Sequence, residues 1–448
     1  MGSTNKHIIA KTLPVTILFV TVYSVIGFSN YIPLDSVFNN TTIWWAISGT
    51  ILILFFLSGY YFYDRNNNKN MIFIFLYIAW NIISLIRGSF VAEIYWDWKA
   101  LIGNSMVLLL PIVTFPATNL SISQSLMSFY TKYTIPIFII FAFIIRTDAW
   151  GFYLMGVTLL IIFIPIISSK HKALLFIITA IVLIADLGAR SNVIKFSVPI
   201  LLILIYYFRE FISTKTLSFF KNILFITPII LFILGVTGLF NVFKMKDYLK
   251  KEVTTTGVDI YGDRSEVSLT DDTRTFLFEE VLSSAIKNDY WLYGRTPTRG
   301  NDSYTFGLIE FELTGRYERL TNEIGLANVF TWSGIIGVIL YLALFYHASS
   351  IAISKSNNIF VKILGIYIAF RWLYSWIEDY QNFSLNFLLL WVMIGLCLSN
   401  SFRDMSNKEI KIWVRGIFDT RYVRYQKKLL KKSLYEKSKN SSPTNMLQ

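Results

Sequence analysis

The stretch ILFITPIILFILGVTGLF, residues Ile223–Phe240, decides the fold class of this 448-residue chain. It contains no charged residue over a length that, as a helix, matches the hydrocarbon core of a bilayer. Only a helix satisfies its own backbone hydrogen bonds there. A similar run, ALLFIITAIVLIA, covers Ala173–Ala185, and the chain as a whole is 54% hydrophobic and 15% charged. Soluble domains contain about a quarter charged residues. The sequence therefore predicts an all-α, polytopic membrane protein.

The apolar runs predict about twelve transmembrane helices. They cover roughly residues 8–27, 42–62, 71–87, 99–117, 133–146, 151–168, 172–187, 193–208, 221–243, 321–347, 358–377 and 384–401. The fifth run is short and contains Pro136, so an alternative is that the fifth and sixth form a hairpin that does not cross fully. The first run lacks a small-residue cleavage site, so we interpret it as a retained helix and not as a signal peptide.

The distribution of lysine and arginine predicts that both termini are cytoplasmic. With the N-terminus inside, twelve basic residues of the short loops fall on the cytoplasmic side and six on the other. Residues 401–448 contain a further 12 basic residues and four acidic ones. We divide the chain into a transmembrane bundle, 1–401, and a basic cytoplasmic tail, 402–448. We expect the tail to lie against anionic lipid headgroups and not to bind nucleic acid, since no nucleic-acid-binding motif is present.

One long extracytoplasmic loop, residues 244–320, is expected between the ninth and tenth spans. It contains 14 of the 28 acidic residues of the chain and 11 basic ones. Within it, DDTRTFLFEEVLSSAIKN (Asp271–Asn288) predicts a helix that Asp271 or Asp272 caps. Its apolar face is predicted to contain Phe278, Val281, Leu282 and Ala285. Arg274 lies one turn earlier on that face. There it either completes a phosphate site at the helix N-terminus or forms a salt bridge with Asp271 or a nearby glutamate.

The loop continues with YGRTPTRGND (Tyr293–Asp302), in which glycines and Pro297 frame Arg295 and Arg299. Arg316 and Arg319, just before the tenth span, add to this cationic cluster. One interpretation is that these arginines bind an anionic substrate. The other is that they fold the loop by pairing with its acidic residues Asp302, Glu310 and Glu312.

Two further arginines lie at the expected outer ends of spans. Arg190 occupies a very short turn in LIADLGARSNVIKF, and Arg87 ends the third span. An ionisable residue at the edge of a helical bundle is a functional candidate, although it can also extend to the headgroups. The three histidines all fall on the cytoplasmic side, and no metal-ligand spacing or phosphate-binding glycine loop occurs, so neither metal nor cofactor is expected.

The order of these motifs resembles the O-antigen polymerase and O-antigen ligase superfamily of cell-surface polysaccharide assembly. The turn GARS contains Arg190, which matches the turn arginine of the family, and Arg274 matches the arginine that begins its loop helix. TNEIGLANVFTWSGIIGVILYLALF (Thr321–Phe345) matches its next span, with Gly334 and Gly337 as the glycine pair. Where the ligases have a histidine, this chain has Asn322–Glu323, which favours the polymerase branch.

The resemblance implies a fold related to the GT-C class of membrane glycosyltransferases, in a bacterial inner (plasma) membrane. It implies a metal-independent polymerase of O-antigen, capsule or a related glycan. That enzyme transfers the growing glycan from undecaprenyl diphosphate to the non-reducing end of a lipid-linked repeat unit. A chain-length regulator and a flippase are expected as partners in the same membrane. We assign catalysis to Arg190, Arg274 and Glu323, and substrate binding to Arg87, Arg295, Arg299, Arg319 and Asn322.

Two alternatives are an O-antigen ligase and, from a different class, a polysaccharide flippase or transporter. The ligase interpretation is weakened by the missing histidine. Transporters commonly consist of two similar halves, and the sequence shows no such repeat.

Overall fold

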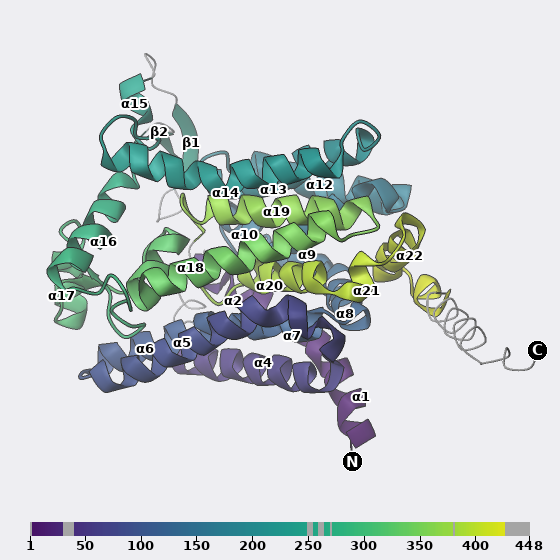
Figure 1. Ribbon diagram of the computed structural model, residues 1–448, viewed down its shortest axis with the longest axis horizontal. Helices are drawn as coiled ribbons and strands as arrows, with labels where there is room; N and C mark the ends of the chain where they lie inside the picture. Colours follow the sequence, from purple (N-terminus) through teal and green to yellow (C-terminus); the bar gives the residue numbers. More distant parts are fainter. Residues whose placement is uncertain are drawn as a thin grey trace, which may run out of the picture.

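The computed structural model describes residues 2–29, 40–248, 254–258, 264–268, 271–379 and 381–425. Its long helices run side by side along the longest dimension of the molecule (Figure 1).

The first third of the chain forms long helices separated by short helical turns. They are α1 (Gly2–Thr12), η1 (Leu13–Val15), α2 (Thr16–Tyr23), η2 (Ile26–Phe28), α4 (Thr41–Phe62), η3 (Arg65–Met71), α5 (Ile72–Val91), α6 (Tyr95–Leu108), η4 (Leu110–Val113) and α7 (Thr114–Ala117). The middle third is more broken. It contains α8 (Leu120–Phe129), η5 (Tyr130–Thr134), α9 (Ile135–Phe141), η6 (Thr147–Ala149), α10 (Trp150–Tyr153), α11 (Gly156–Ile162), η7 (Ile164–Ile166), α12 (Ser169–Ala185), α13 (Arg190–Tyr207) and α14 (Thr214–Val236).

The long loop and the C-terminal helices follow. The loop contains α15 (Met245–Tyr248), β1 (Thr254–Val258), β2 (Arg264–Ser268), α16 (Thr275–Lys287), β3 (Asn301–Asp302), α17 (Gly307–Thr314) and β4 (Glu318–Arg319). Two antiparallel pairs, β1 with β2 and β3 with β4, are the strand pairings of the described residues. The remaining helices are α18 (Gly325–Ser354), α19 (Ile359–Tyr374), α20 (Leu385–Leu398), α21 (Asn400–Arg403) and α22 (Asn407–Phe418).

Seven helices of the described residues are long and apolar enough to cross a membrane, which confirms the expected all-α polytopic class. They correspond to the expected spans one to four, eight, nine and ten. The runs 172–187, 358–377 and 384–401 form the shorter helices α12, α19 and α20. The runs 133–146 and 151–168 are broken, and α9 and α11 are each about 10 Å long at 1.5 Å per residue. The non-crossing hairpin alternative fits these lengths, and twelve crossings stays a prediction.

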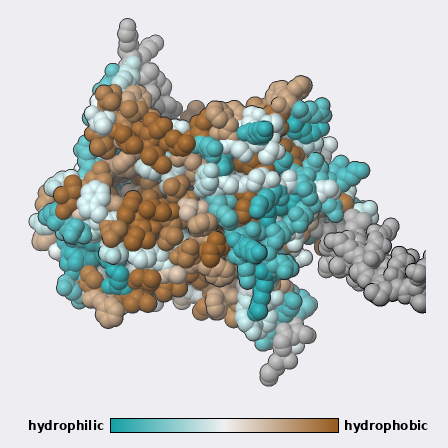
Figure 2. Space-filling view, in the orientation of Figure 1, coloured by the Kyte–Doolittle hydropathy of each residue, from teal (hydrophilic) through white to brown (hydrophobic). Residues whose placement is uncertain are grey.

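The two ends of the bundle differ. Helices α1 and α22 lie at one end, and α16 and α17 of the long loop lie at the opposite end (Figure 1). Hydrophilic residues gather over α21 and α22, with a smaller group near α17, and hydrophobic residues cover much of the surface between (Figure 2). Both ends of the described chain therefore lie away from the long loop, as the cytoplasmic placement of the termini requires.

The side of the membrane is testable with reporter fusions. An alkaline phosphatase, which is active only outside the cytoplasm, is expected to be active when inserted in the α17 turn at Gly315. It is expected to be inactive when fused after Gln448, because the lysine and arginine distribution holds that end inside. Activity of the second fusion would contradict the orientation.

The beginning of the basic tail packs on the bundle. The Trp413 indole of α22 donates to the Leu120 carbonyl at 3.0 Å, and the Gln124 amide donates to the Trp413 carbonyl at 2.6 Å. Helix α22 therefore forms part of the folded unit. Residues 426–448, which include most of the lysines of the tail, lie outside the described residues.

A break in α18 positions the long loop. Gly334 has φ 66° and ψ −169°, a conformation open almost only to glycine, so the helix consists of two halves. The backbone N–H of Ile335, which begins the second half, donates to the Trp291 carbonyl at 2.8 Å. A Cβ on Gly334 would overlap the Leu292 carbonyl. The loop backbone thus caps a helix end that would otherwise leave N–H groups unpaired.

The same contact explains a glycine of the loop. Gly294 has φ 73°, and a Cβ there would overlap the backbone of α18 beside Gly334. The next residue, Arg295, donates its backbone N–H to the Thr331 carbonyl at 2.7 Å. Two glycines therefore face each other across the contact between loop and helix. We call residues 291–302, which make this contact, the docked loop.

The docked loop is also attached to α5 and α6. The Arg87 guanidinium of α5 donates to the carbonyls of Tyr293 at 2.6 Å and Gly294 at 3.0 Å. The Asn104 amide of α6 donates to the Pro297 carbonyl at 2.8 Å. Three helices thus hold one short stretch of extramembrane backbone.

Candidate functional site

Helix α16 begins as the sequence predicts. The Asp272 carboxylate accepts from the backbone N–H groups of Arg274 at 3.1 Å and Thr275 at 2.9 Å, which confirms Asp272 as a capping side chain. The apolar face of α16 packs against the start of α18 through a small buried cluster. That cluster is Leu277, Val281, Ile324 and Ala327. The packing brings the first residue before α16 next to the residues that precede α18.

Arg274 and Glu323 form an ion pair at this junction. The Nη1 of Arg274 lies 2.5 Å from the Glu323 carboxylate, and its Nε donates to the Ile377 carbonyl at 3.3 Å. Arg319 contacts the other oxygen of Glu323 at 3.6 Å. We call Arg274, Arg319 and Glu323 the Arg274 cluster. Of the two sequence interpretations of Arg274, the pairing with a nearby glutamate is present, and it places two arginines on one carboxylate.

The Arg274 cluster has an excess of positive charge. The side chains of Arg274 and Arg319 are 18% and 13% exposed, and Glu323 is 50% exposed. The Nη1 of Arg319 is buried with no hydrogen-bond partner among the described residues. Within the cluster two guanidinium groups share one carboxylate in a partly desolvated position, while Glu310 of α17 offsets part of the Arg319 charge from outside the cluster. Such a position favours an anionic ligand.

Arg190, at the start of α13, lies at the same end of the bundle. Its neighbour Ser191 shares a hydrogen bond of 3.0 Å with the Tyr374 hydroxyl, near the end of α19. The pKa of Asp271 is lowered, first by a hydrogen bond from Lys246 and also by the charge of Arg190. The Arg190 charge therefore reaches the residues just before α16, and Asp271 pairs with Lys246 and not with Arg274.

Arg295 and Arg299 pair with acidic residues of the loop itself. Arg299 contacts both carboxylate oxygens of Glu318, with its Nε at 2.8 Å, and Arg295 contacts Glu318 at 2.9 Å and Asp302 at 2.8 Å. Both arginine side chains are mostly buried. The loop-folding interpretation predicted a pairing with Asp302, which is present. The main partner, Glu318, was not among the acidic residues that the sequence analysis named.

Glu318→Ala is expected to unfold the docked loop. The substitution leaves the nearly buried Arg299 without its carboxylate while Arg295 keeps Asp302, which is expected to cost about 3 kcal/mol, the lower end for a broken buried pair. The measurement is limited proteolysis of the purified protein, followed by mapping of the cut sites. Cuts are expected within residues 293–319. Glu312→Ala, at an exposed carboxylate of α17, is the matched control, and equal protease resistance of the two variants would contradict the prediction.

Asn322 and Arg87, also predicted to bind substrate, make structural contacts. The buried Asn322 donates its amide to the Asn301 side chain at 2.7 Å, and its backbone N–H donates to the Asn328 side chain at 2.6 Å. Arg87 uses two of its N–H groups on the docked loop. Neither residue belongs to the Arg274 cluster, and their role in substrate binding stays a prediction.

The sequence analysis missed a buried ionic group beneath this site. Asp379 contacts Arg371 of α19 at 2.7 Å and Lys195 of α13 at 3.7 Å, and it accepts from the Asn386 amide at 2.9 Å. Burial alone would raise the pKa of Asp379, but Arg371 and Lys195 hold it below its ordinary value. Arg371 and Lys195 are two of the six basic residues that the sequence places at the non-cytoplasmic ends of spans. Their positions inside apolar runs were the signal that marks them as functional candidates.

The buried ionic group fixes the turn that supports Arg274. Asp379 has a left-handed backbone, with φ 72°, at the end of this turn. The Glu378 and Ser375 carbonyls of this turn accept from the first N–H groups of α18, at Gly325 and Leu326, both at 2.9 Å. The start of α18 and the Arg274 guanidinium are thus attached to one turn.

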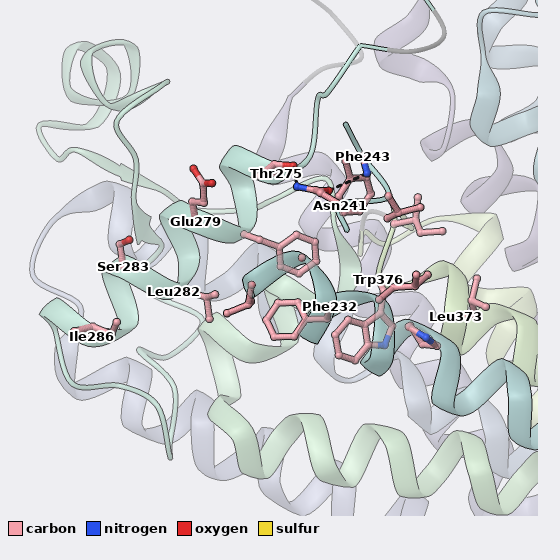
Figure 3. Close-up of a pocket in the computed structure, with 17 residues that line it drawn as sticks. Phe232, Asn241, Phe243, Thr275, Glu279, Leu282, Ser283, Ile286, Leu373 and Trp376 are labelled. Atoms are coloured by element: carbon pink, nitrogen blue, oxygen red, sulfur yellow. Dashed lines mark hydrogen bonds between the residues drawn. The ribbon is translucent and has the colours of Figure 1, made fainter. Parts of the chain in front are cut away.

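An apolar groove lies beside the Arg274 cluster, between α14, α16 and α19. Its volume is about 340 Å³. Figure 3 shows the rings of Phe232 and Trp376 on its floor, and Leu282 and Ile286 of α16 along one side. Of the predicted packed face of α16, Val281 and Ala285 are buried and Phe278 packs against the buried cluster, while Phe278 and Leu282 also line this groove.

Comparisons with models of protein families, with curated proteins and with solved structures find no match for this chain.

Proposed function

We propose that this protein is a membrane polymerase of cell-surface polysaccharide. Its donor is a growing glycan on undecaprenyl diphosphate, and its acceptor is the non-reducing-end hydroxyl of an incoming lipid-linked repeat unit. The GT-C relationship and the placement in a bacterial inner membrane belong to this proposal, as do the expected chain-length regulator and flippase. The motif order of the sequence is its starting point.

The observation that carries the proposal is the Arg274 cluster. A lipid-linked substrate needs a cationic site at the end of a membrane-spanning bundle. The cluster supplies two guanidinium groups there, one with an unpartnered N–H among the described residues. Guanidinium groups bind phosphate bidentately and stay charged. Arg190, whose charge reaches Asp271, adds to the same positive field.

The reaction is a substitution at the anomeric carbon. The acceptor hydroxyl forms the new C–O bond, and the bond from that carbon to the diphosphate breaks with its electron pair on oxygen. Arg274, Arg190 and Arg319 stabilise the negative charge that builds on the leaving undecaprenyl diphosphate. Glu323 is half exposed, so a hydroxyl can reach it, and it accepts the hydroxyl proton as the glycosidic bond forms. Arg295 and Arg299 hold the loop in place through Glu318, and any contact of theirs with the substrate is additional.

The experiment is a reconstitution of purified protein in liposomes with an undecaprenyl-diphosphate-linked repeat unit. A ladder of longer lipid-linked glycans and release of undecaprenyl diphosphate are expected. A parallel reaction contains lipid A as acceptor. Transfer only to lipid A would identify a ligase, and flipping of the substrate without bond formation would identify a transporter. Either outcome overturns the proposal.

A further inference from the structure

The apolar groove opens toward the lipid-facing surface of the bundle. Helix α14, which forms one wall, is a candidate membrane span with only 17% of its residues buried. Ile226, Ile230 and Ile233 on its outer face are about half exposed. Val236 and Ile286, which line the groove, are 65% and 68% exposed, so the groove opens at the outer surface of the bundle, beside a helix that carries apolar residues on both of its faces.

The opposite wall leads directly to the Arg274 cluster. Ile377 lines the groove, and its carbonyl accepts from the Arg274 Nε at 3.3 Å. Thr275, the residue after Arg274, also lines the groove. The floor and the cationic cluster are thus parts of one continuous surface, with the apolar part toward the bilayer and the charged part beyond it.

The floor is aromatic and has one unused donor. The rings of Phe232 and Trp376 lie 5.6 Å apart, and those of Phe232 and Phe278 lie 5.5 Å apart (Figure 3). The indole Nε1 of Trp376 is buried without a hydrogen-bond partner in the part of the chain that the structure describes. Because this N–H is itself buried, the faces of the aromatic rings and not the indole donor form the contact surface of the groove.

We propose that this groove holds the first isoprene units of the lipid-linked substrate, with the diphosphate at the Arg274 cluster. The inference rests on the proposed function and deepens it by placing the lipid. Flat, branched isoprene units fit between aromatic rings, and the charge at the groove end suits a diphosphate. The isoprenoid chain of the substrate enters the groove from a bilayer that is equally apolar. The groove therefore contributes mainly packing and orientation. An effect of about tenfold in KM, or about 1.4 kcal/mol, is expected from it.

The first test compares two variants of α14 one residue apart. Leu231→Trp fills the groove that Leu231 lines, whereas Ile230→Trp, the control, adds the same bulk on the lipid-facing side. Each is assayed with substrates that carry the same sugar and diphosphate on a C55 or a C15 isoprenoid. Leu231→Trp is expected to raise KM about tenfold for both the C55 and the C15 substrate, because both carry the first isoprene units, while the control Ile230→Trp stays near wild type. Equal kinetics of the two variants overturns the groove assignment.

The second test does not depend on polymerase activity. The wild-type protein is irradiated with undecaprenyl diphosphate that carries a diazirine on an isoprene unit near the phosphate, and the labelled peptides are mapped. Label is expected on residues 228–243, 275–286 or 373–377, with competition by unlabelled undecaprenyl diphosphate. Label elsewhere, or equal competition by phosphatidylglycerol, overturns the inference even if the protein polymerises glycans. Specific label without polymerisation would retain the groove and reject the proposed function.

Discussion

Arg274→Ala is expected to abolish polymer formation while the protein level stays close to wild type. The guanidinium is 18% exposed and faces the half-exposed Glu323, so its removal takes a fixed charge from a partly desolvated position. Loss of one group that stabilises charge in a transition state typically costs a few kcal/mol, a hundredfold or more in rate. The measurements are the glycan ladder in cells and the initial rate with purified lipid-linked repeat unit.

Two further variants separate catalysis from folding. Arg274→Lys is expected to recover little activity, because an ammonium is a point charge that cannot form a bidentate contact. Arg209→Ala, at an exposed arginine that follows α13, is the matched control and is expected to retain full rate. Full activity of the double variant Arg274→Ala/Glu323→Ala would show that Arg274 only neutralises the charge of Glu323. That result would contradict the catalytic assignment of Arg274.

Gly334→Ala is expected to be strongly destabilising. Its φ of 66° with ψ −169° is strained for any side chain, and the added Cβ would overlap the Leu292 carbonyl, which is backbone and cannot rotate away. The break in α18 and the docked loop must then separate, with an expected loss of more than about 4 kcal/mol. The measurement is the apparent melting temperature and the folded fraction in detergent.

A second variant tests a positive φ without steric overlap. Gly315 also has a positive φ, 75°, but nothing lies within 4 Å of its Cβ position. Gly315→Ala is therefore expected to cost only about 1 kcal/mol, the usual penalty for a left-handed residue with a side chain. If the two variants melt together, steric contact between loop and helix does not determine stability.

Local patterns predicted the parts of this structure that depend on local interactions. The length and composition of apolar runs indicated the membrane-crossing helices, because a bilayer allows few other structures. The start of α16 followed from the Asp272 cap and helical spacing, and Arg274 was placed correctly at that start. The pairing of Arg274 with a glutamate was one of two stated alternatives, although Glu323 lies 49 residues away in the sequence.

The contacts that could not be predicted are non-local. Glu318 reaches Arg299 because β3 and β4 pair, and neither two-residue strand has a recognisable pattern in the sequence. Lys195 and Arg371 both contact Asp379, and they do so only after α13 and α19 have packed together. A count of charges in each loop instead assigns both residues to the surface. Gly294 and Gly334 must both be glycine because the docked loop packs directly on α18. This requirement likewise cannot be predicted from either segment alone.

The attachment of the docked loop has a consequence for the order of events during synthesis. Its backbone is held by Arg87 and Asn104, made about 200 residues earlier, and by Thr331 and Ile335, made afterwards. When the ribosome has completed the loop, half of its binding surface does not yet exist. The loop must therefore wait in an exposed state until α18 has entered the membrane, because non-local contacts form only after both partners are present. A nascent chain that ends before Gly334 has the arginines of the site but lacks the helix that arranges them.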